Sequence, residues 1–534
     1  MEARLTFCRA PLQSNEGGTT KMVTGRINED DFRELVEQRA QPLLALVSYL
    51  SKCEPLDDCL TRPLAGELLS QAMQLEEFLD TYDAGKCCTW CNLRSLTAAF
   101  KLFADVSYEL LHICHRIPTY RLMPVAKDFA AATDETLKFI NGILLGAAKE
   151  LVAKAKEMNL KVPSGEQVAE AYTERRLTGH LPHDCQARRS QSVAETVALL
   201  ATAFLNLASE SEDVRAASRA KHEEFALCVA ATLTEERLRS LEFRFHNLQS
   251  KYDTYVSGTE VEQKDQDLPV LRGHASVVFH LLKIATSFAH YYERHVNKEP
   301  CIAPPFAQRL ISPDGLLNVL MNYSITFIDL YIGCTINVCQ EMLKRYAEVG
   351  RIEVPIPKYR GFHVRPSTLI ARLVWHYGSN IQMLLGDVTY DAGLPLDLFR
   401  ANEAINAQKR RWLAKEIARL ELVPENAPPE DVTSVVRSTI LALAQRGKLI
   451  MYEQPLEIPE HAGTPEGTLL ERVISETGRL LALGKIDIET DMTAQFIGDK
   501  RVLADIRLLA QYGYGEDNFG NNIALPEKLS YLRR

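Results

Sequence analysis

The chain has 534 residues, which is too many for a single hydrophobic core and predicts about three domains. With 46% hydrophobic and 25% charged residues, its composition is that of a folded protein and excludes wholesale disorder. A net charge of -9 gives no bulk attraction to nucleic acid or to an anionic membrane, so neither is expected as a partner.

The N-terminal segment, residues 1–27, has the polar, glycine-containing composition of a flexible leader. It lacks the apolar stretch of a signal peptide, which predicts a cytoplasmic protein. Twelve cysteines are too few for a disulfide scaffold and are expected to be reduced thiols packed in the interior. We therefore predict no disulfide, no metal and no cofactor.

Residues 28–349 are expected to form an all-α region, because apolar residues recur there at intervals of three and four. Prolines divide the pattern into helices of the length found in bundles, among them 135–159 with Asp134 at its start. Segments 95–116, 197–212 and 275–295 resemble one another. Duplicated helical hairpins would explain this, and so would the general similarity of amphipathic helices. The region is interpreted as a sensor, docking or dimerisation module, with a homo-oligomer as one possibility.

The least charged stretch, residues 315–340, is long enough to cross a bilayer. Asparagine and hydroxyl side chains interrupt it, and their burial in lipid would be costly. A core helix is therefore predicted, without membrane insertion.

The pattern changes after Gly350. Alternating apolar residues and tight turns predict strands, and longer periodic segments predict helices. The predicted order is strand 352–356, helix 364–375, strands 380–385 and 387–391, helix 396–420, helix 432–446, strand 448–453 and helix 465–484. Residues 491–534 are expected to be an irregular C-terminal tail that packs back on the body.

The residues best suited to chemistry lie between the first of these strands and the helix after it. His363 directly precedes the helix, so unpaired backbone N–H groups and the positive end of the helix dipole would face any anion on its ring. Pro366 suits the first helical turn, and Gly361 permits a sharp turn before it. Arg365 offers a two-pronged donor for phosphate oxygens, with Arg360 as a weaker second candidate.

The segment Gly-Phe-His-Val-Arg-Pro-Ser-Thr-Leu-Ile (361–370) resembles the active-site signature of the HPr family. These proteins are the histidine-containing phosphocarriers of the bacterial sugar phosphotransferase system. Phe362 and Val364 are conservative departures from the signature. The resemblance implies that His363 accepts a phosphoryl group and that Arg365 stabilises it, supported by Gly361, by Arg360 and by the backbone of Val364, Pro366 and Ser367.

The resemblance also implies an α+β open-faced β-sandwich of order β-α-β-β-α-β-α. We place this HPr-like domain at 350–490, with a helical insertion at about 421–447. Strand 448–453 and helix 465–484 would then be the family's fourth strand and third helix. Many Gram-positive members carry a regulatory serine at the start of the second helix, but residues 390–393 contain none, so control by a serine kinase is not expected.

Other groupings of polar residues are weaker. Cysteines 87, 88 and 91 with His112, Cys114 and His115, and the set His180, His183 and Cys185, have some of the spacings of zinc ligands but lack a second Cys-x-x-Cys pair. Histidines 274, 280, 290 and 295 do not share one helix face. Buried thiols and ordinary histidines are the better interpretation.

The sequence thus predicts a large helical region joined to an HPr-like phosphocarrier or regulatory domain, rather than a stand-alone turnover enzyme. The implied partner is an enzyme I-type phosphotransferase or another phosphohistidine protein. The alternative is a non-catalytic scaffold whose HPr fold survives only as a binding surface.

Overall fold

The computed structural model describes residues 25–53, 59–174, 192–296, 310–423, 432–452, 455–458, 467–488 and 491–533. Residues 1–24 of the expected leader lie outside these ranges. Within them the chain is mostly helical with a small antiparallel sheet, and no strand precedes Val349. The prediction that residues 28–349 are helical is confirmed for the part that is described.

Two compact units make up the chain, one of Met1–Ala104 with Gly142–Glu174 and the other of Asp105–Asn141 with Arg175–Arg534. The expected boundary at residue 349 is therefore not the one that separates them. The first unit contains α1 (Glu29–Leu50), α2 (Arg62–Thr81) and α5 (Val168–Ala171), with parts of α3 (Cys91–Arg116) and α4 (Phe129–Glu157).

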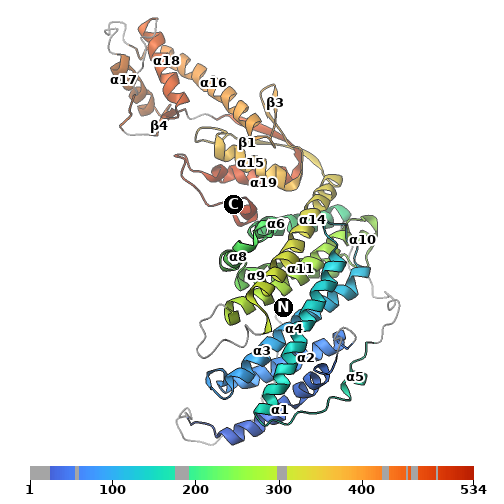
Figure 1. Cartoon of the computed structure of the whole chain (residues 1–534). Coiled ribbons are helices and arrows are strands. Elements are labelled where there is room, and N and C mark those ends of the chain that lie inside the picture. The colour runs from blue at the N-terminus through green and yellow to red at the C-terminus, as the bar shows by residue number, and fades with distance from the viewer. Residues whose placement is uncertain are drawn as a thin grey trace, which may run out of the picture. The chain divides into compact units, whose positions relative to one another are not determined.

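The second unit begins with a helical bundle. In it α11 packs against α9 and α14, and α6 packs against α14 and α9 (Figure 1). Phe204, Phe245, Phe288 and Phe327 are fully buried in this bundle. Its helices are the remainders of α3 and α4, then α6 (Val193–Glu210), α7 (Glu212–Ala216), α8 (Phe225–Ala231), α9 (Glu235–Tyr255), α10 (Glu260–Lys264), α11 (Leu268–Tyr291), α13 (Pro313–Val319) and α14 (Thr326–Arg345).

Side-chain caps mark several helix starts. Ser192 and Glu195 form a capping box at α6, and Thr468 and Glu471 form another at α18 (Leu469–Ala482). The helix expected from residue 135 begins earlier, because Asp128 already accepts the N–H of Ala131 at the start of α4. Asp134 is therefore an interior residue of that helix.

Within the described ranges, two helical segments are long and apolar enough to cross a membrane, Val193–Glu210 and Pro313–Arg345. Core helices of soluble proteins meet the same criteria, and about half of each apolar window is buried in the protein (44% and 56%). The second segment contains a π-helical stretch at Leu320–Ile325, whose Met321, Tyr323 and Ser324 are buried in the bundle.

After the bundle comes a four-stranded sheet of order β1-β6-β2-β3, in which all neighbours are antiparallel. Burial alternates along β1, with Ile352 and Val354 inside and Arg351 and Glu353 outside, so one face of the sheet is covered. α19 packs on β1 and β6, and α16 packs on β3. The elements are β1 (Val349–Pro355), α15 (Val364–Tyr377), β2 (Gln382–Leu385), β3 (Val388–Asp391), α16 (Pro395–Arg419), β6 (Thr493–Asp499) and α19 (Lys500–Gln511).

The predicted fourth strand is wrong. Of the described residues 448–452, only Ile450–Met451 is a strand (β4), and it pairs with β5 (Ile486–Asp487) in a separate two-stranded sheet. The place between β1 and β2 belongs to β6, which buries Ala494 and Phe496, and α19 follows it. Both lie in the segment expected to be an irregular tail.

The inserted segment is therefore longer than expected, running from about 420 to 492 rather than from 421 to 447. It contains α17 (Val432–Gln445), β4, α18 and β5. The predicted helix 432–446 is confirmed. The segment has its own hydrophobic core, to which the end of α16 contributes Leu413 and Ile417.

Candidate functional site

The loop between β1 and α15 carries the motif and has an unusual backbone. Arg360 and Gly361 both have positive φ angles, 55° and 63°. A Cβ on Gly361 would lie 2.1 Å from Oδ1 of Asn402, so glycine is required there. The next residue, Phe362, is fully buried, and its ring lies 6.4 Å from that of Phe496. The loop thus enters the core just before His363.

His363 occupies the N-cap position of α15, as predicted. Its Nδ1 lies 3.1 Å from the carbonyl oxygen of Gly361, and its Nε2 lies 3.0 Å from a carboxylate oxygen of Glu516. The side chain is 21% exposed. A neutral imidazole has a single N–H, so only one of these two contacts can be a hydrogen bond at a time.

Arg365 approaches the same carboxylate, with Nε 3.9 Å from Oε1 of Glu516. That distance is too long for a hydrogen bond, and this nitrogen is shielded from solvent without a hydrogen-bond partner among the described residues. Gly515 lies against the guanidinium, where an added Cβ would come within 3.3 Å of Nε. The structure thus brings His363 and Arg365 together around an acidic residue.

The other predicted site residues divide into two groups. Pro366 has no N–H, and the N–H of Ser367 donates to the carbonyl of His363 (3.2 Å) while its hydroxyl donates to that of Phe362 (2.8 Å). Neither can bind phosphate through its backbone, which corrects that expectation. The N–H groups of Val364 and Arg365 have no acceptor within the helix and remain as donors.

Arg360, the second candidate guanidinium, faces the inserted segment. Its Cζ lies 6.0 Å from the centre of the Tyr359 ring, and the group packs against Gly484. The backbone of Arg360 is held by two side chains. Its N–H donates to Asp487, and its carbonyl accepts from Asn402. Arg360 thus links the motif loop to the insertion.

Glu516, Asn402 and Asp487 are site residues that sequence reasoning missed. Glu516 lies 153 residues after His363 in a loop that follows α19, and no spacing rule connects them. Tyr514 fixes that loop by donating its hydroxyl to the carbonyl of Pro355 (2.7 Å) at the end of β1. Burial raises the pKa of Tyr514, so the hydroxyl stays protonated as a donor.

The cysteines differ in part from expectation. Cys87 and Cys88 are exposed rather than interior, because they lie in the turn before α3. Among the described residues, all cysteines are free thiols and no cluster of metal-ligating side chains occurs. His180, His183 and Cys185 lie outside the described residues. The rings of His112 and His280 are in tilted contact, with centres 4.4 Å apart.

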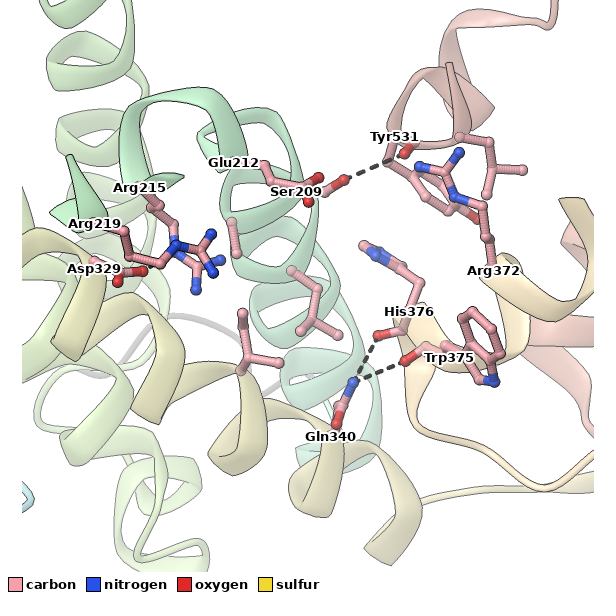
Figure 2. A pocket seen from close by; sticks show the side chains of 14 residues that line it. Ser209, Glu212, Arg215, Arg219, Asp329, Gln340, Arg372, Trp375, His376 and Tyr531 are labelled. Atoms are coloured by element: carbon pink, nitrogen blue, oxygen red, sulfur yellow. Dashed lines mark hydrogen bonds and ion pairs between the residues drawn. The ribbon is translucent and has the colours of Figure 1, made fainter. Parts of the chain in front are cut away.

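A cavity of about 480 Å³ lies at the other end of α15 (Figure 2). There Gln340 donates to the carbonyls of Trp375 (2.9 Å) and His376 (3.2 Å), and Arg215 pairs with Asp329 (2.9 Å). The ring of His376 stacks on Tyr531, and burial lowers its pKa to about 4, so it is neutral. The contacts of Gln340, together with that of His376 to Asn206 (3.0 Å), anchor the C-terminus of α15 to the bundle. Because these side chains are engaged in structural contacts, the cavity is a weaker candidate for a functional site than the motif.

Comparison with known proteins finds no matching family model, no similar curated protein and no similar solved structure.

Proposed function

We propose that the segments 349–419 and 493–511 form an HPr-like domain and that His363 is a phosphoryl acceptor. The observation that carries this proposal is the order of the elements around the motif. With the insertion set aside, the elements follow one another along the chain as β1-α15-β2-β3-α16-β6-α19, and the four strands form a single sheet. This is the β-α-β-β-α-β-α order of the HPr family. His363 occupies the first strand-to-helix junction, where the family's signature lies.

The local chemistry supports the same role. A ring nitrogen with a free lone pair would attack the phosphorus of a phosphohistidine donor, forming a new P–N bond while the donor's P–N bond breaks. The added dianion would meet the N–H groups of Val364 and Arg365 and the guanidinium of Arg365. Either nitrogen must first leave its present neighbour, which is Gly361 O for Nδ1 and Glu516 for Nε2.

A scaffold without phosphotransfer is the second candidate, and one observation favours it. The carboxylate of Glu516 occupies the space beside Nε2 and is only 8% exposed. A phosphoryl group on this nitrogen would place further negative charge next to the carboxylate. In this case the HPr-like surface would bind a partner and His363 would contribute only a hydrogen bond.

The two candidates separate in one experiment. The protein is incubated with phosphoenolpyruvate and a bacterial enzyme I, and its intact mass is measured at neutral pH. We expect a gain of one acid-labile phosphoryl group that is absent in His363→Ala. Unmodified protein under conditions that phosphorylate an ordinary HPr would contradict the proposal and favour the scaffold.

Arg365→Lys tests the role assigned to the guanidinium. An ammonium group cannot grip two oxygens as a fork does, so acceptance should continue but slow by about tenfold, the effect of losing roughly 1.4 kcal/mol of stabilisation in the transition state. Arg507→Lys, at an exposed position on α19, is the matched control and should leave the rate unchanged. Equal rates for the two variants would remove Arg365 from the mechanism.

A further inference from the structure

The motif loop is held by residues that lie outside the loop itself. Positive φ angles at the two consecutive residues Arg360 and Gly361 are unfavourable for a non-glycine residue such as Arg360 and persist only where surrounding contacts impose them. Asp487 Oδ2 accepts the N–H of Arg360 at 3.2 Å, and Asn402 Nδ2 donates to its carbonyl at 3.1 Å. One residue is thus fixed at both of its backbone polar groups, from β5 and from α16.

Asp487 is itself held firmly in the core of the insertion. Its Oδ1 lies 2.6 Å from Nζ of Lys409, and the two side chains are only 5% and 2% exposed. The N–H of Ile488 and the hydroxyl of Tyr452 also donate to its carboxylate, at 2.7 and 3.3 Å. A buried ion pair of this kind contributes little net stability compared with apolar residues of similar volume. Stability alone therefore does not explain the pair.

A row of aromatic rings leads from the same carboxylate to His363. The ring of Tyr452 lies 4.8 Å from that of Tyr359, and the ring of Tyr359 lies 5.4 Å from the imidazole, edge to face in both cases. Burial, together with the charge of Asp487, raises the pKa of Tyr452. Its hydroxyl therefore remains a donor that fixes the first ring in place.

We propose that the insertion 420–492 is a positioning module for the motif, in which Asp487 sets the backbone of Arg360 and, with Tyr452, the orientation of the His363 ring. Asn402 completes the clamp from α16. Asp487 is a positioning residue that acts through Arg360 and does not touch the ring itself. The inference deepens the proposed function, but the orientation of the ring can be tested without any phosphotransfer.

Two double variants compare Asp487 with and without the oxygens that accept from Arg360, Tyr452 and Ile488. Lys409→Met with Asp487→Asn removes both buried charges and keeps an acceptor, whereas Lys409→Met with Asp487→Leu removes the charges and the acceptor together. Asparagine and leucine have similar branched shapes, so packing is matched. The measurement is the rate at which diethyl pyrocarbonate modifies His363, followed by peptide mass spectrometry, with the exposed His246 as internal reference.

We expect modification of His363 to be faster in the leucine variant by about fivefold, the factor permitted by losing the one hydrogen bond of ordinary strength that reaches the motif loop at Arg360. The asparagine variant should keep the parent rate, and His246 should not change. Equal rates for His363 in the parent and both variants would overturn the proposal.

Asn402→Ala provides a second route if the leucine variant does not fold. Asn402 is only partly buried, and its loss frees the carbonyl of Arg360 without leaving a charge unpaired. It should accelerate modification in the same direction, and an unchanged rate would again contradict the role. Altered modification in a protein that never accepts phosphate would retain the positioning role and remove the phosphocarrier function.

Discussion

Two histidines in the second unit show how differently this chain uses the same side chain. His274, in the bundle helix α11, is fully buried. The N–H of Met123 donates to its Nε2 (2.9 Å), and its Nδ1 donates to the hydroxyl of Thr335 (2.7 Å). One donor and one acceptor are what a neutral imidazole requires. His274 is therefore fixed in one tautomer and one orientation.

His363 has the opposite surroundings. Both of its nitrogens face oxygen atoms that can only accept, and the ring is partly exposed at a helix N-terminus. A neutral ring leaves one of these contacts unsatisfied. The surroundings of the bundle histidine thus match a single neutral tautomer, whereas the motif histidine faces two acceptors with only one N–H to donate.

The largest effect on stability is expected from the buried charges of the bundle. Glu109 contacts Nδ1 of His280 (2.6 Å) and the ammonium of Lys283. Glu109→Ala therefore leaves the buried His280 without its carboxylate, whereas the partly exposed Lys283 keeps Asp105 (3.2 Å) as a partner. The free energy of unfolding should fall by about 3–5 kcal/mol, measured by urea denaturation. The exposed Glu135→Ala should change this free energy by less than about 0.5 kcal/mol.

By contrast, His363→Ala should lower the free energy of unfolding by less than about 1 kcal/mol, because the motif histidine contributes little packing.

The second largest effect is a loss of folding stability at acidic pH. Burial lowers the pKa of His274 from its ordinary value of 6.5 to about 4. The unfolded chain therefore takes up a proton first, so stability is complete above 6.5 and is lost as the pH falls toward 4. Between pH 7 and pH 5 the loss due to this residue should be about 2 kcal/mol.

Urea denaturation at the two pH values measures this loss. His274→Gln keeps an acceptor for the N–H of Met123 but cannot be protonated, so its decrease in stability should be smaller than that of the parent. His376, whose pKa is also lowered to about 4 by burial, should retain its own share of the decrease. Identical pH profiles for the parent and His274→Gln would show that His274 is not the acid-sensitive group.

The smallest effect on stability is expected at the motif. Glu516→Gln removes the negative charge beside His363 but keeps the shape of the side chain and an oxygen that can accept from Nε2, so the free energy of unfolding should change by only about 1 kcal/mol. A phosphoryl dianion would no longer face a carboxylate, so acceptance by His363 should become faster by roughly fivefold, as expected for about 1 kcal/mol of repulsion between charges near water. Glu527→Gln, exposed in the same C-terminal segment, is the control. Slower acceptance in Glu516→Gln would instead indicate that the carboxylate assists the transfer.

Periodicity predicted the helices because each must bury one face, and it located β1 through α16 correctly. It does not predict β6 (Thr493–Asp499), because this alternating segment is short and directly follows an acidic stretch. The position of β6 between β1 and β2 is a long-range pairing, which local patterns do not encode.

The same distinction between local patterns and long-range contacts applies to the residues of the candidate site. The sequence identifies His363 and Arg365 because their motif is contiguous, whereas Asn402, Asp487 and Glu516 reach it from 42, 127 and 153 residues away. Chain folding alone brings them together. Phosphotransfer, the partner enzyme, the cytoplasmic location and an oligomer formed through the bundle remain predictions.

The most direct test of the account is to locate the phosphoryl group among the 13 histidines of the chain. The protein is labelled from phosphoenolpyruvate through enzyme I, digested at neutral pH and mapped by mass spectrometry. We predict that the label lies on His363 alone and that the buried His274 carries none. Label on any other residue, or no label at all, would contradict the assignment of His363 as the acceptor.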